Sequence, residues 1–403
     1  MKNIFKSRAL PVTLAIAALV VAGFAYFTLQ SKTEAEGVWF DTEWQYRKQI
    51  TIDNLEVSGA HTNFPMLFSV TDPDLADTAN GGGVASSTAG DILFVDWEGN
   101  KIDHEIEKYT NTSGELVAWV EMPFVSSTST RAIHIYYGNA SASYQPTNAA
   151  TWNSNYTGVW HLGDGDSTAT GFYKDSKSTN NGTLTDADGD STQATGKIGS
   201  AFDFNGDADT IEFGTGPKPT LSSPWSMSAW ASFDTTGNFP GFASFYDPAN
   251  STPHVGAGLA SSAADVKILT GGETPGDGSV LTSGLLYHLV LIYNSSQLCI
   301  YVNGSQDYCV TPSGSNWQSG TDFHAGREGR TALGFKLWDG IVDELRVSNI
   351  ERNGDWVATE YSNQNNPSSF YSYDSQEQGS RAAETSSLNV RGGFNVRGGV
   401  KIK

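Results

Sequence analysis

Cysteine and positive charge are both scarce in this chain. Its 403 residues include two cysteines, and 24 Lys and Arg stand against 44 Asp and Glu, which gives a formal net charge of -20. Because nucleic-acid binding needs a basic surface, this charge argues against a nucleic-acid partner. The sequence also lacks the cysteine and histidine spacing of a zinc site, a phosphate-binding glycine loop and a nucleophile elbow.

Glycine and aromatic residues are plentiful, with 43 Gly, 20 Phe, 16 Tyr and 11 Trp. Short β-branched and aromatic runs bounded by Asn, Gly, Ser or Asp occur at 286–294, 297–304 and 339–348. Such runs are typical of antiparallel strands in a sandwich. The length allows two sizeable domains. We therefore predict an all-β, exported protein with two β-sandwich domains.

The two cysteines lie in a predicted hairpin. Asn303-Gly304 is a turn dipeptide, because both residues tolerate positive φ. Cys299 and Cys309 are equidistant from Gly304, so the hairpin places them opposite each other, where a disulfide can form. We predict this bridge; the alternative is two separate small buried side chains.

Residues 1–36 read as an export segment. Lys2, Lys6 and Arg8 precede an apolar stretch without charge at 10–29. About 20 apolar residues span a bilayer, and a basic flank stays in the cytoplasm. We predict an anchored protein on the extracellular side of the cell surface, with a cleaved signal peptide and secretion as the alternative.

Residues 38–147 contain several short strand candidates separated by turns, which predicts a first β-sandwich. The motifs Tyr46-Arg-Lys-Gln-Ile-Thr-Ile, Gly90-Asp-Ile-Leu-Phe and Ile135-Tyr-Tyr-Gly-Asn139 resemble a family defined only as domain of unknown function 2341. That resemblance implies no established activity, but the family commonly precedes a laminin-G-like module in surface proteins. A small polar linker at 140–151 follows.

Residues 152–373 contain an ordered series of motifs: Trp160-His-Leu, Asp175-Ser, Trp225-Ser-Met-Ser-Ala-Trp230, Tyr301-Val-Asn-Gly304 and Gly340-Ile-Val-Asp-Glu-Leu-Arg-Val-Ser348. In this order the motifs resemble the laminin-G-like modules of the concanavalin A-like lectin/glucanase superfamily. This resemblance implies a jelly roll. A short helix is expected at 353–361, with its aromatic residues packed back on the sandwich. The tail at 374–403 is predicted to be disordered up to Ser387, and two Asn-Val-Arg-Gly-Gly repeats follow.

A calcium site is predicted in an acidic loop. Asp186, Asp188 and Asp190 alternate around a turn-forming glycine, and Ca²⁺ prefers such hard oxygen ligands. The laminin-G resemblance adds Asp175 and Asp343 as metal ligands or structural hydrogen-bond acceptors. Ordinary acidic turns are the alternative.

Aromatic residues predict a glycan-binding surface. Lectins stack sugars on exposed rings, and Trp317, Phe323, Trp338 and Tyr246 lie near predicted strand ends or loops. Core packing is the alternative for each ring.

The strand at 103–107 carries a candidate catalytic pattern. Asp103, Glu105 and Glu107 project from one face at intervals of about 7 Å. Glycosidases that retain configuration use two carboxyl groups ~5 Å apart. A solvated strand face explains the pattern without any chemistry, and the residues also match the pattern of the unknown-function family. Asp343 and the adjacent Glu344 are expected on opposite faces of their strand, so that pair is not predicted to act together.

These patterns favour a non-enzymatic cell-surface protein that binds glycan or another surface protein, with calcium holding its loops. Fold-level resemblance carries most of this inference. A structural component of a surface layer or appendage is the first alternative, and a glycan-cleaving enzyme is the second. His104, His161, His288 and His324 are expected to be structural.

Overall fold

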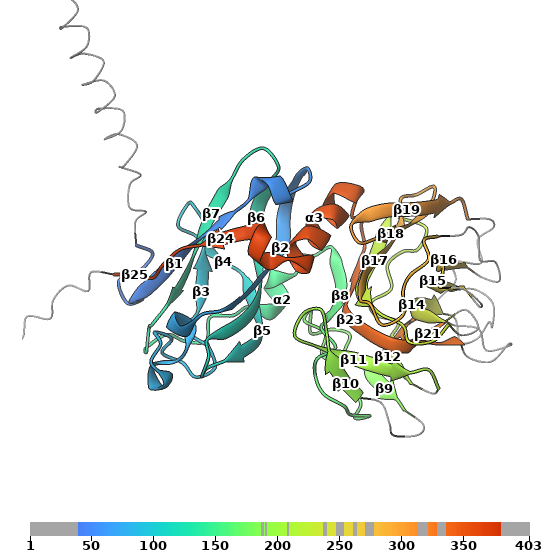
Figure 1. The fold of residues 1–403 in the computed structure, drawn as a ribbon, viewed down its shortest axis with the longest axis horizontal. Coiled ribbons are helices and arrows are strands. Elements are labelled where there is room, and N and C mark those ends of the chain that lie inside the picture. The colour runs from blue at the N-terminus through green and yellow to red at the C-terminus, as the bar shows by residue number, and fades with distance from the viewer. Residues whose placement is uncertain are drawn as a thin grey trace, which may run out of the picture. The chain divides into compact units, whose positions relative to one another are not determined.

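Strands are the main secondary structure of the described chain, and they form two β-sandwiches (Figure 1). The computed structural model describes residues 39–379, with gaps at 187–188, 190–191, 208, 237–239, 247–253, 261–263, 271–277, 313–320 and 329–335. The predicted membrane segment and the tail repeats lie outside the described residues, as do Asp188, Asp190 and Trp317. No helix in the described part is both long and apolar enough to cross a membrane. The all-β prediction is confirmed.

The first sandwich has two antiparallel sheets. One sheet has the order β24 (Tyr371–Tyr373), β1 (Tyr46–Ile52), β7 (Arg131–Tyr137), β3 (Leu93–Val95) and β4 (Lys101–Ile102), and β25 (Glu377–Gln378) also pairs with β1. The other has the order β2 (Ala60–Thr71), β6 (Glu115–Ser126) and β5 (His104–Thr110). Ile50, Phe68 and Phe94 are fully buried between the sheets, where the Phe68 and Phe94 rings are in contact. Short 3-10 turns lie at η1 (Asn54–Glu56), η2 (Pro73–Leu75) and η3 (Thr78–Asn80).

The second sandwich is larger. Its first sheet has the order β10 (Thr192–Thr195), β11 (Ser200–Asn205), β23 (Asp339–Ser348), β13 (Trp225–Ala231), β17 (Tyr287–Tyr293), β18 (Leu298–Val302) and β19 (Ser305–Val310), and β8 (Tyr156–Trp160) also pairs with β23. The facing sheet has the order β16 (Val266–Thr270), β15 (His254–Leu259), β14 (Gly241–Tyr246), β20 (Asp322–Ala325), β12 (Thr210–Gly214) and β9 (Thr183–Thr185). A small pair joins β21 (Arg327–Glu328) to β22 (Lys336–Leu337).

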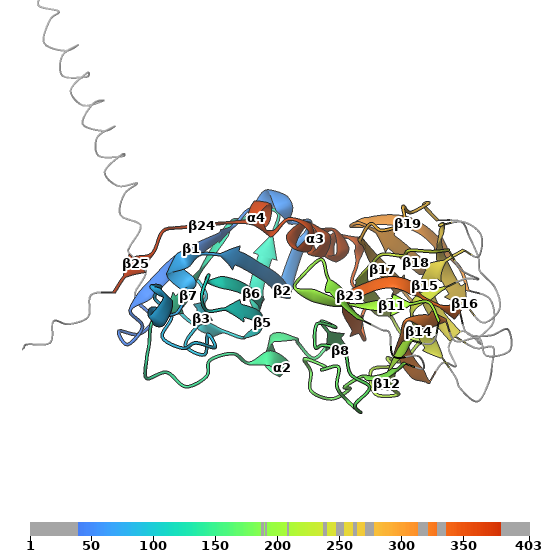
Figure 2. The same cartoon turned by 60° about the horizontal axis from the view of Figure 1, so that its bottom comes forward.

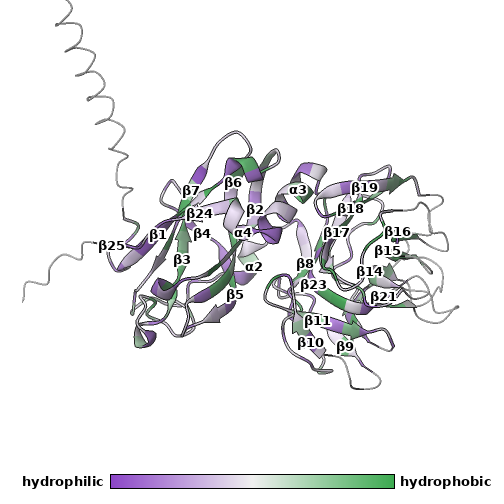
Figure 3. Cartoon of the chain, viewed as in Figure 1, coloured by the Kyte–Doolittle hydropathy of each residue, from purple (hydrophilic) through white to green (hydrophobic). Residues whose placement is uncertain are grey.

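Apolar side chains explain why these strands pack as layers. Figure 3 shows hydrophobic residues gathered on strands such as β3, whose residues are all buried. In the second sandwich, Trp225 and Leu291 of one sheet and Phe245 of the other lie in one core. Burying one such aromatic or aliphatic side chain contributes roughly 1.5–3 kcal/mol.

The predicted hairpin and its disulfide are confirmed. Cys299 of β18 is paired with Cys309 of β19, and their sulfur atoms are bonded. Asn303 and Gly304 form the turn with φ angles of 49° and 82°. Two consecutive positive φ angles match the twist of the flanking strands, which is why Asn-Gly predicted this turn.

The chain returns to the first sandwich after completing the second. Ile50, Thr51 and Ile52 of β1 pair with β24, and the start of β1 pairs with β25. Figures 1 and 2 both show the red C-terminal strands beside blue β1. Two expectations are therefore corrected: residues 371–373 belong to the first sandwich, and residues 377–378 form a strand within the tail predicted to be disordered. The polar composition of this segment predicted a free tail, but the segment forms strands that hydrogen-bond to the edge strand β1.

Helix α3 (Gly354–Asn365) contacts both sandwiches. Its N-cap Asn353 accepts a hydrogen bond from the Trp356 backbone N–H at 3.0 Å, which explains where the helix begins. Asn363 exchanges two hydrogen bonds with the Leu67 backbone of β2, at 2.7 and 3.1 Å. Val357, in contrast, packs on Val290 of β17. The predicted helix is confirmed, and it continues four residues beyond the expected end to Asn365.

The segments after α3 and before β8 also join the first sandwich. Phe370, at the end of α4 (Pro367–Phe370), lies in its core. Trp152 follows α2 (Asn148–Thr151) and is fully buried in the same core. Both sandwiches belong to one compact unit that begins at Glu43.

Candidate functional site

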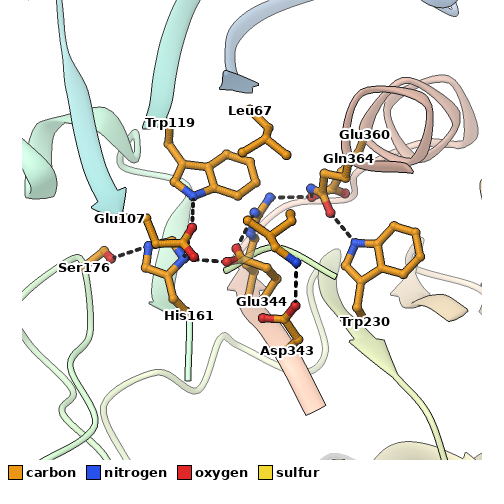
Figure 4. Close-up of polar contacts among 12 residues, drawn as sticks. Leu67, Glu107, Trp119, His161, Ser176, Trp230, Asp343, Glu344, Glu360 and Gln364 are labelled. Atoms are coloured by element: carbon orange, nitrogen blue, oxygen red, sulfur yellow. Dashed lines mark hydrogen bonds and ion pairs between the residues drawn. The ribbon is translucent and has the colours of Figure 1, made fainter. Parts of the chain in front are cut away.

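His161 is the centre of a buried polar cluster between the two sandwiches (Figure 4). It follows β8, whose last residue, Trp160, points into the second core, so the next side chain points out of that core. The His161 Nδ1 lies 2.7 Å from Glu344 Oε1 and 3.5 Å from Glu107 Oε2. Its Nε2 lies 3.2 Å from Ser176 Oγ and 3.5 Å from Glu105 Oε2. Carboxyl groups from both sandwiches thus converge on one imidazole.

The first sandwich contributes its two glutamates from β5. The pairing of β5 with β6 shifts by one residue between Ile106 and Lys108, so Glu107 occupies a β-bulge. The Trp119 indole N–H donates to Glu107 Oε2 at 2.9 Å. Glu105 accepts hydrogen bonds from the Trp152 indole at 2.6 Å and from the Ser176 hydroxyl at 2.8 Å. The expected common face of Glu105 and Glu107 is confirmed by their shared contact with His161.

The second sandwich contributes Asp343 and Glu344 from β23. The register between β13 and β23 shifts beside these residues, and Glu344 has a positive φ of 54°. Val342 and Leu345 on either side both point into the second core, so the two acidic residues between them both point away from it. The expectation that Asp343 and Glu344 lie on opposite faces is wrong, because a bulge interrupts the period-two alternation.

Arg346 connects these carboxylates to helix α3. Its guanidinium donates to Glu344 Oε2 and to Glu360 Oε1, both at 2.8 Å. It also lies 4.2 Å from the ring centroid of Trp119 and 4.8 Å from that of Trp152. The Arg346 side chain is 2 % exposed, so its ion pairs are shielded from solvent.

The surroundings set the charge of each group. Burial, followed by the charge of Glu344, raises the pKa of Glu107 to about 8. Burial and Glu344 also raise the pKa of Asp343 well above its ordinary value. Burial alone would lower the pKa of His161, but the carboxylates of Glu344, Glu107 and Glu105 outweigh it and raise that pKa well above the ordinary value.

The remaining two carboxylates stay ionised. Burial opposes the ionisation of Glu344, yet His161 and Arg346 lower its pKa. Burial likewise opposes the ionisation of Glu105, yet His161 and the hydrogen bonds from Trp152 and Ser176 lower its pKa. The surroundings therefore favour a charged imidazole and two ionised carboxylates, and they favour the protonated forms of Glu107 and Asp343.

A cavity of about 550 Å³ opens beside this cluster. Glu105, Glu107, His161 and Ser176 line its inner wall. The rest of its wall is also mostly polar and consists of Lys108, Asn148, Gly163, Asp164, Lys174, Asp175, Ser178, Asn181, Gly199 and Ser200, with Ile106 as an apolar member. A pocket of this volume is large enough for a small ligand.

The predicted calcium ligands are not gathered in the described structure. Asp175 accepts hydrogen bonds from the backbone N–H groups of Val159, Lys177 and Asn180 at 2.9–3.0 Å, and it also binds Thr179. Asp343 accepts the Ile198 backbone N–H at 3.0 Å. These two residues therefore have the alternative role predicted for them, as structural acceptors.

Asp186 accepts the Gly189 backbone N–H at 2.5 Å, within the acidic loop whose other two aspartates lie outside the described residues. A calcium site at this loop therefore stays a prediction. Within residues 39–379 and outside their gaps, the group that could hold a metal is Glu107, His161 and Glu344.

The predicted sugar-stacking aromatics are corrected. Phe323, Trp338 and Tyr246 are 0 %, 1 % and 3 % exposed. Phe323 and Trp338 lie in the core of the second sandwich, and the Trp338 indole donates to the Ser232 carbonyl at 2.9 Å. Trp317 lies outside the described residues. Because Phe323, Trp338 and Tyr246 are buried, their rings are not accessible for stacking against a sugar.

Three members of the cluster carry no clear signal in the sequence. The sequence predicts a structural His161 and a Glu344 on the face opposite to Asp343, and it gives no signal for Arg346. The signal that the sequence did carry was the alternation of Glu105 and Glu107 along one strand. The contacts of His161 with Glu105 and Glu107 depend on how the two sandwiches pack, which no local pattern reports.

Comparisons with known protein families match two consecutive segments of the chain. Residues 205–358 match the model of the concanavalin A-like lectin/glucanases superfamily. Residues 88–183 match the model of domain of unknown function 2341. No curated protein matches the chain.

Several solved structures are loosely similar. Domain 4 of the extracellular arabinanase AbnA from Geobacillus stearothermophilus, solved with arabinotriose, has 20% identity and a TM-score of 0.42, covering 52% of this chain and 98% of its own. Trypanosoma rangeli sialidase has 12% identity and a TM-score of 0.41, covering 65% and 44%. The binding domain of Paraclostridial Mosquitocidal Protein 1 has 13% identity and a TM-score of 0.38, covering 51% and 52%.

At TM-scores below 0.5, none of these structures assigns an activity to this chain. The two family models carry the assignment instead, since they match in the order expected from the sequence motifs. This chain contains a laminin-G-like module of the concanavalin A-like lectin/glucanase superfamily, preceded by a domain of unknown function 2341.

Proposed function

We propose that this chain is a non-enzymatic cell-surface protein that binds glycan in the cavity beside His161. The observation that carries the proposal is the polar wall of this cavity of about 550 Å³. Lys174 supplies an ammonium donor, Asp164 a carboxyl group, and Asn181 an amide. Sugar hydroxyls both donate and accept hydrogen bonds, so a wall that mixes these groups suits them.

The family match supports the same class of ligand, because the superfamily is named for lectins and glucanases. The polar stretch of wall replaces the aromatic platform expected from the sequence, so recognition would rest mainly on hydrogen bonds. The apolar segment at 10–29 supports a location at the cell surface, either anchored or released. Calcium at the acidic loop remains part of this proposal.

A glycan array with the full chain tests the proposal. Ser200 is exposed, begins β11 and lines the cavity, so Ser200→Trp would fill it with an indole ring. Thr192→Trp is the matched control, because Thr192 is exposed on the paired strand β10 and does not line the cavity. We expect Ser200→Trp to weaken glycan binding at least tenfold and Thr192→Trp to leave it unchanged.

Two outcomes would contradict the glycan proposal. If the wild-type chain binds no glycan but captures a surface protein or assembles into an ordered layer, the cavity is not a sugar site. If Ser200→Trp and Thr192→Trp bind the same glycan equally, the sugar binds elsewhere.

A second candidate, glycan cleavage, is favoured by one observation. Glu105 and Glu107 line the same cavity, and their environments move their pKa values in opposite directions, downward for Glu105 and upward to about 8 for Glu107. Glycosidases use one ionised carboxylate as nucleophile or base and one protonated carboxyl group as general acid. Incubation of any bound glycan with wild type and Glu107→Gln tests this candidate. Product formed by wild type and lost in the variant would support cleavage, and an intact glycan would exclude it.

A further inference from the structure

Three potential metal-ligand atoms lie together on the inner wall of the cavity and beside it. One nitrogen of His161 and one oxygen each from Glu107 and Glu344 all lie within 4.8 Å of one another. Nδ1 of His161 is 2.7 Å from Glu344 Oε1 and 3.5 Å from Glu107 Oε2. Ligands around a tetrahedral ion with bonds of about 2.0–2.2 Å lie roughly 3.3–3.6 Å apart, so small side-chain shifts would complete such a site.

The local charge favours an added cation. Five carboxyl groups stand in and around the cluster with two cationic side chains; the carboxyl groups are Glu105, Glu107, Asp343, Glu344 and Glu360, and the cations are His161 and Arg346. Glu360 already shares Arg346 with Glu344. Carboxyl groups therefore outnumber cationic side chains in this mostly buried region, and buried carboxyl groups need compensation by a cation or a proton.

Asp343 provides an independent observation. Its side chain is 0 % exposed, and its Oδ1 has no hydrogen-bond partner among the described residues. It shares the outward face of the β23 bulge with Glu344, and the charges of Glu344 and Glu107 help to raise its pKa. A buried oxygen without a partner is costly, and it can be satisfied by a metal ion or by a water bound to one.

We propose that Glu107, His161 and Glu344 bind a first-row divalent transition metal. One imidazole nitrogen with carboxylate oxygens suits Zn²⁺ or Mn²⁺, whereas Ca²⁺ prefers oxygen ligands alone. The site is distinct from the calcium loop at residue 186. It also does not depend on a glycan, because all three ligands come from the protein.

The metal would have two consequences. Glu107 belongs to the first sandwich and the other two ligands to the second, so the ion would fasten one sandwich to the other. Glu107 and His161 also line the cavity, so a remaining coordination position could accept a water or an oxygen of a ligand from there. An open position of this kind distinguishes ligand-binding metal sites from purely structural ones.

Calorimetric titration of the metal-stripped full chain with Zn²⁺, Mn²⁺ and Ca²⁺ tests the proposal. We expect one Zn²⁺ or Mn²⁺ per chain with a micromolar or tighter Kd, and a raised unfolding midpoint by mass action. Glu107→Gln is the informative variant, because an amide oxygen can still accept the Trp119 N–H but is a poorer ligand. Its Kd should rise at least tenfold. Glu121→Gln on the neighbouring strand β6 is the matched control and should bind as wild type.

Other results would overturn the proposal. Absence of Zn²⁺ and Mn²⁺ binding at 100 µM would mean that the cluster is only an ion-pair network. Binding of Ca²⁺ alone, or Zn²⁺ binding unchanged in both Glu107→Gln and His161→Gln, would place any metal elsewhere. Since Glu107→Gln and Glu121→Gln are both isosteric, circular dichroism spectra that match wild type establish that each variant is folded. If the chain binds Zn²⁺ but no glycan on the array, the glycan proposal is contradicted and the metal proposal is not.

Discussion

Removing the positive charge of Arg346 tests whether the buried cluster holds the two sandwiches together. Arg346→Met keeps most of the side-chain volume but leaves Glu344 and Glu360 without their shared cation. Both lost ion pairs are 2.8 Å long, and the guanidinium also lies 4.2 Å from the Trp119 ring centroid. Breaking a buried ion pair by removing one partner costs about 3–5 kcal/mol of unfolding free energy, because uncompensated charge remains buried.

Urea unfolding, followed by tryptophan fluorescence and by circular dichroism, measures this loss. Coincident transitions would justify a two-state treatment, and an unchanged slope would show that the lost stability is not a change in exposed surface. Arg131→Met is the matched control, because Arg131 on β7 is only partly buried and contacts the rings of Trp97 and Phe124. It should cost less than about 1 kcal/mol.

A double-mutant cycle separates the ion pair from other effects. If Glu344→Gln is added to Arg346→Met, the combined loss should be smaller than the sum of the two single losses, since each removes the same interaction. An Arg346→Met loss within about 1 kcal/mol of wild type would refute the reasoning. It would mean that water or a neighbouring residue compensates the two glutamates.

Three further outcomes are expected. The raised pKa of Glu107, about 8, makes the folded state retain a proton that the unfolded state releases above its ordinary pKa. The unfolding free energy should therefore fall between pH 5 and pH 8, and Glu107→Gln should flatten that fall in urea titrations at several pH values. Equal slopes of unfolding free energy against pH in wild type and variant would contradict this assignment. Replacing both cysteines by serine should lower the unfolding free energy by about 2–3 kcal/mol, since the disulfide joins residues with a sequence separation of 10. Wild type melted with a reductant should match the variant. A variant as stable as oxidised wild type would contradict this expectation. A chain ending at Phe370 lacks β24 and β25, so its β1 amides should be less protected from hydrogen exchange than those of a chain ending at Gly379. Equal protection in the two chains would mean that pairing with β24 and β25 does not stabilise β1.

The sequence predicted features that depend on neighbouring residues. The alternation of β-branched and aromatic residues indicated strands, Asn303-Gly304 indicated the turn, and the equal distances of the cysteines from Gly304 indicated the disulfide. Glu105 and Glu107 were placed on one face by the period of a strand. The order of longer motifs identified both families.

Expectations based on residue type alone were less reliable. Phe323 and Trp338 were considered as sugar platforms, but a large ring near a strand end gains more by burial in a sandwich core than by exposure. A polar composition after residue 373 suggested disorder, yet main-chain hydrogen bonds to the open edge of β1 do not depend on hydrophobic side chains.

The candidate site itself was decided by tertiary structure. His161 meets Glu344 because β8 pairs with β23, and it meets Glu107 because the two sandwiches pack against each other, across sequence separations that no local pattern encodes. A bulge at Asp343 and Glu344 turned both side chains outward, against the simple alternation of a strand. The sequence by itself thus determined the strands, the hairpin and the families, because these follow from local backbone preference and apolar periodicity. Packing alone brought the buried charges together, because their pKa values and partners depend on distances between remote segments.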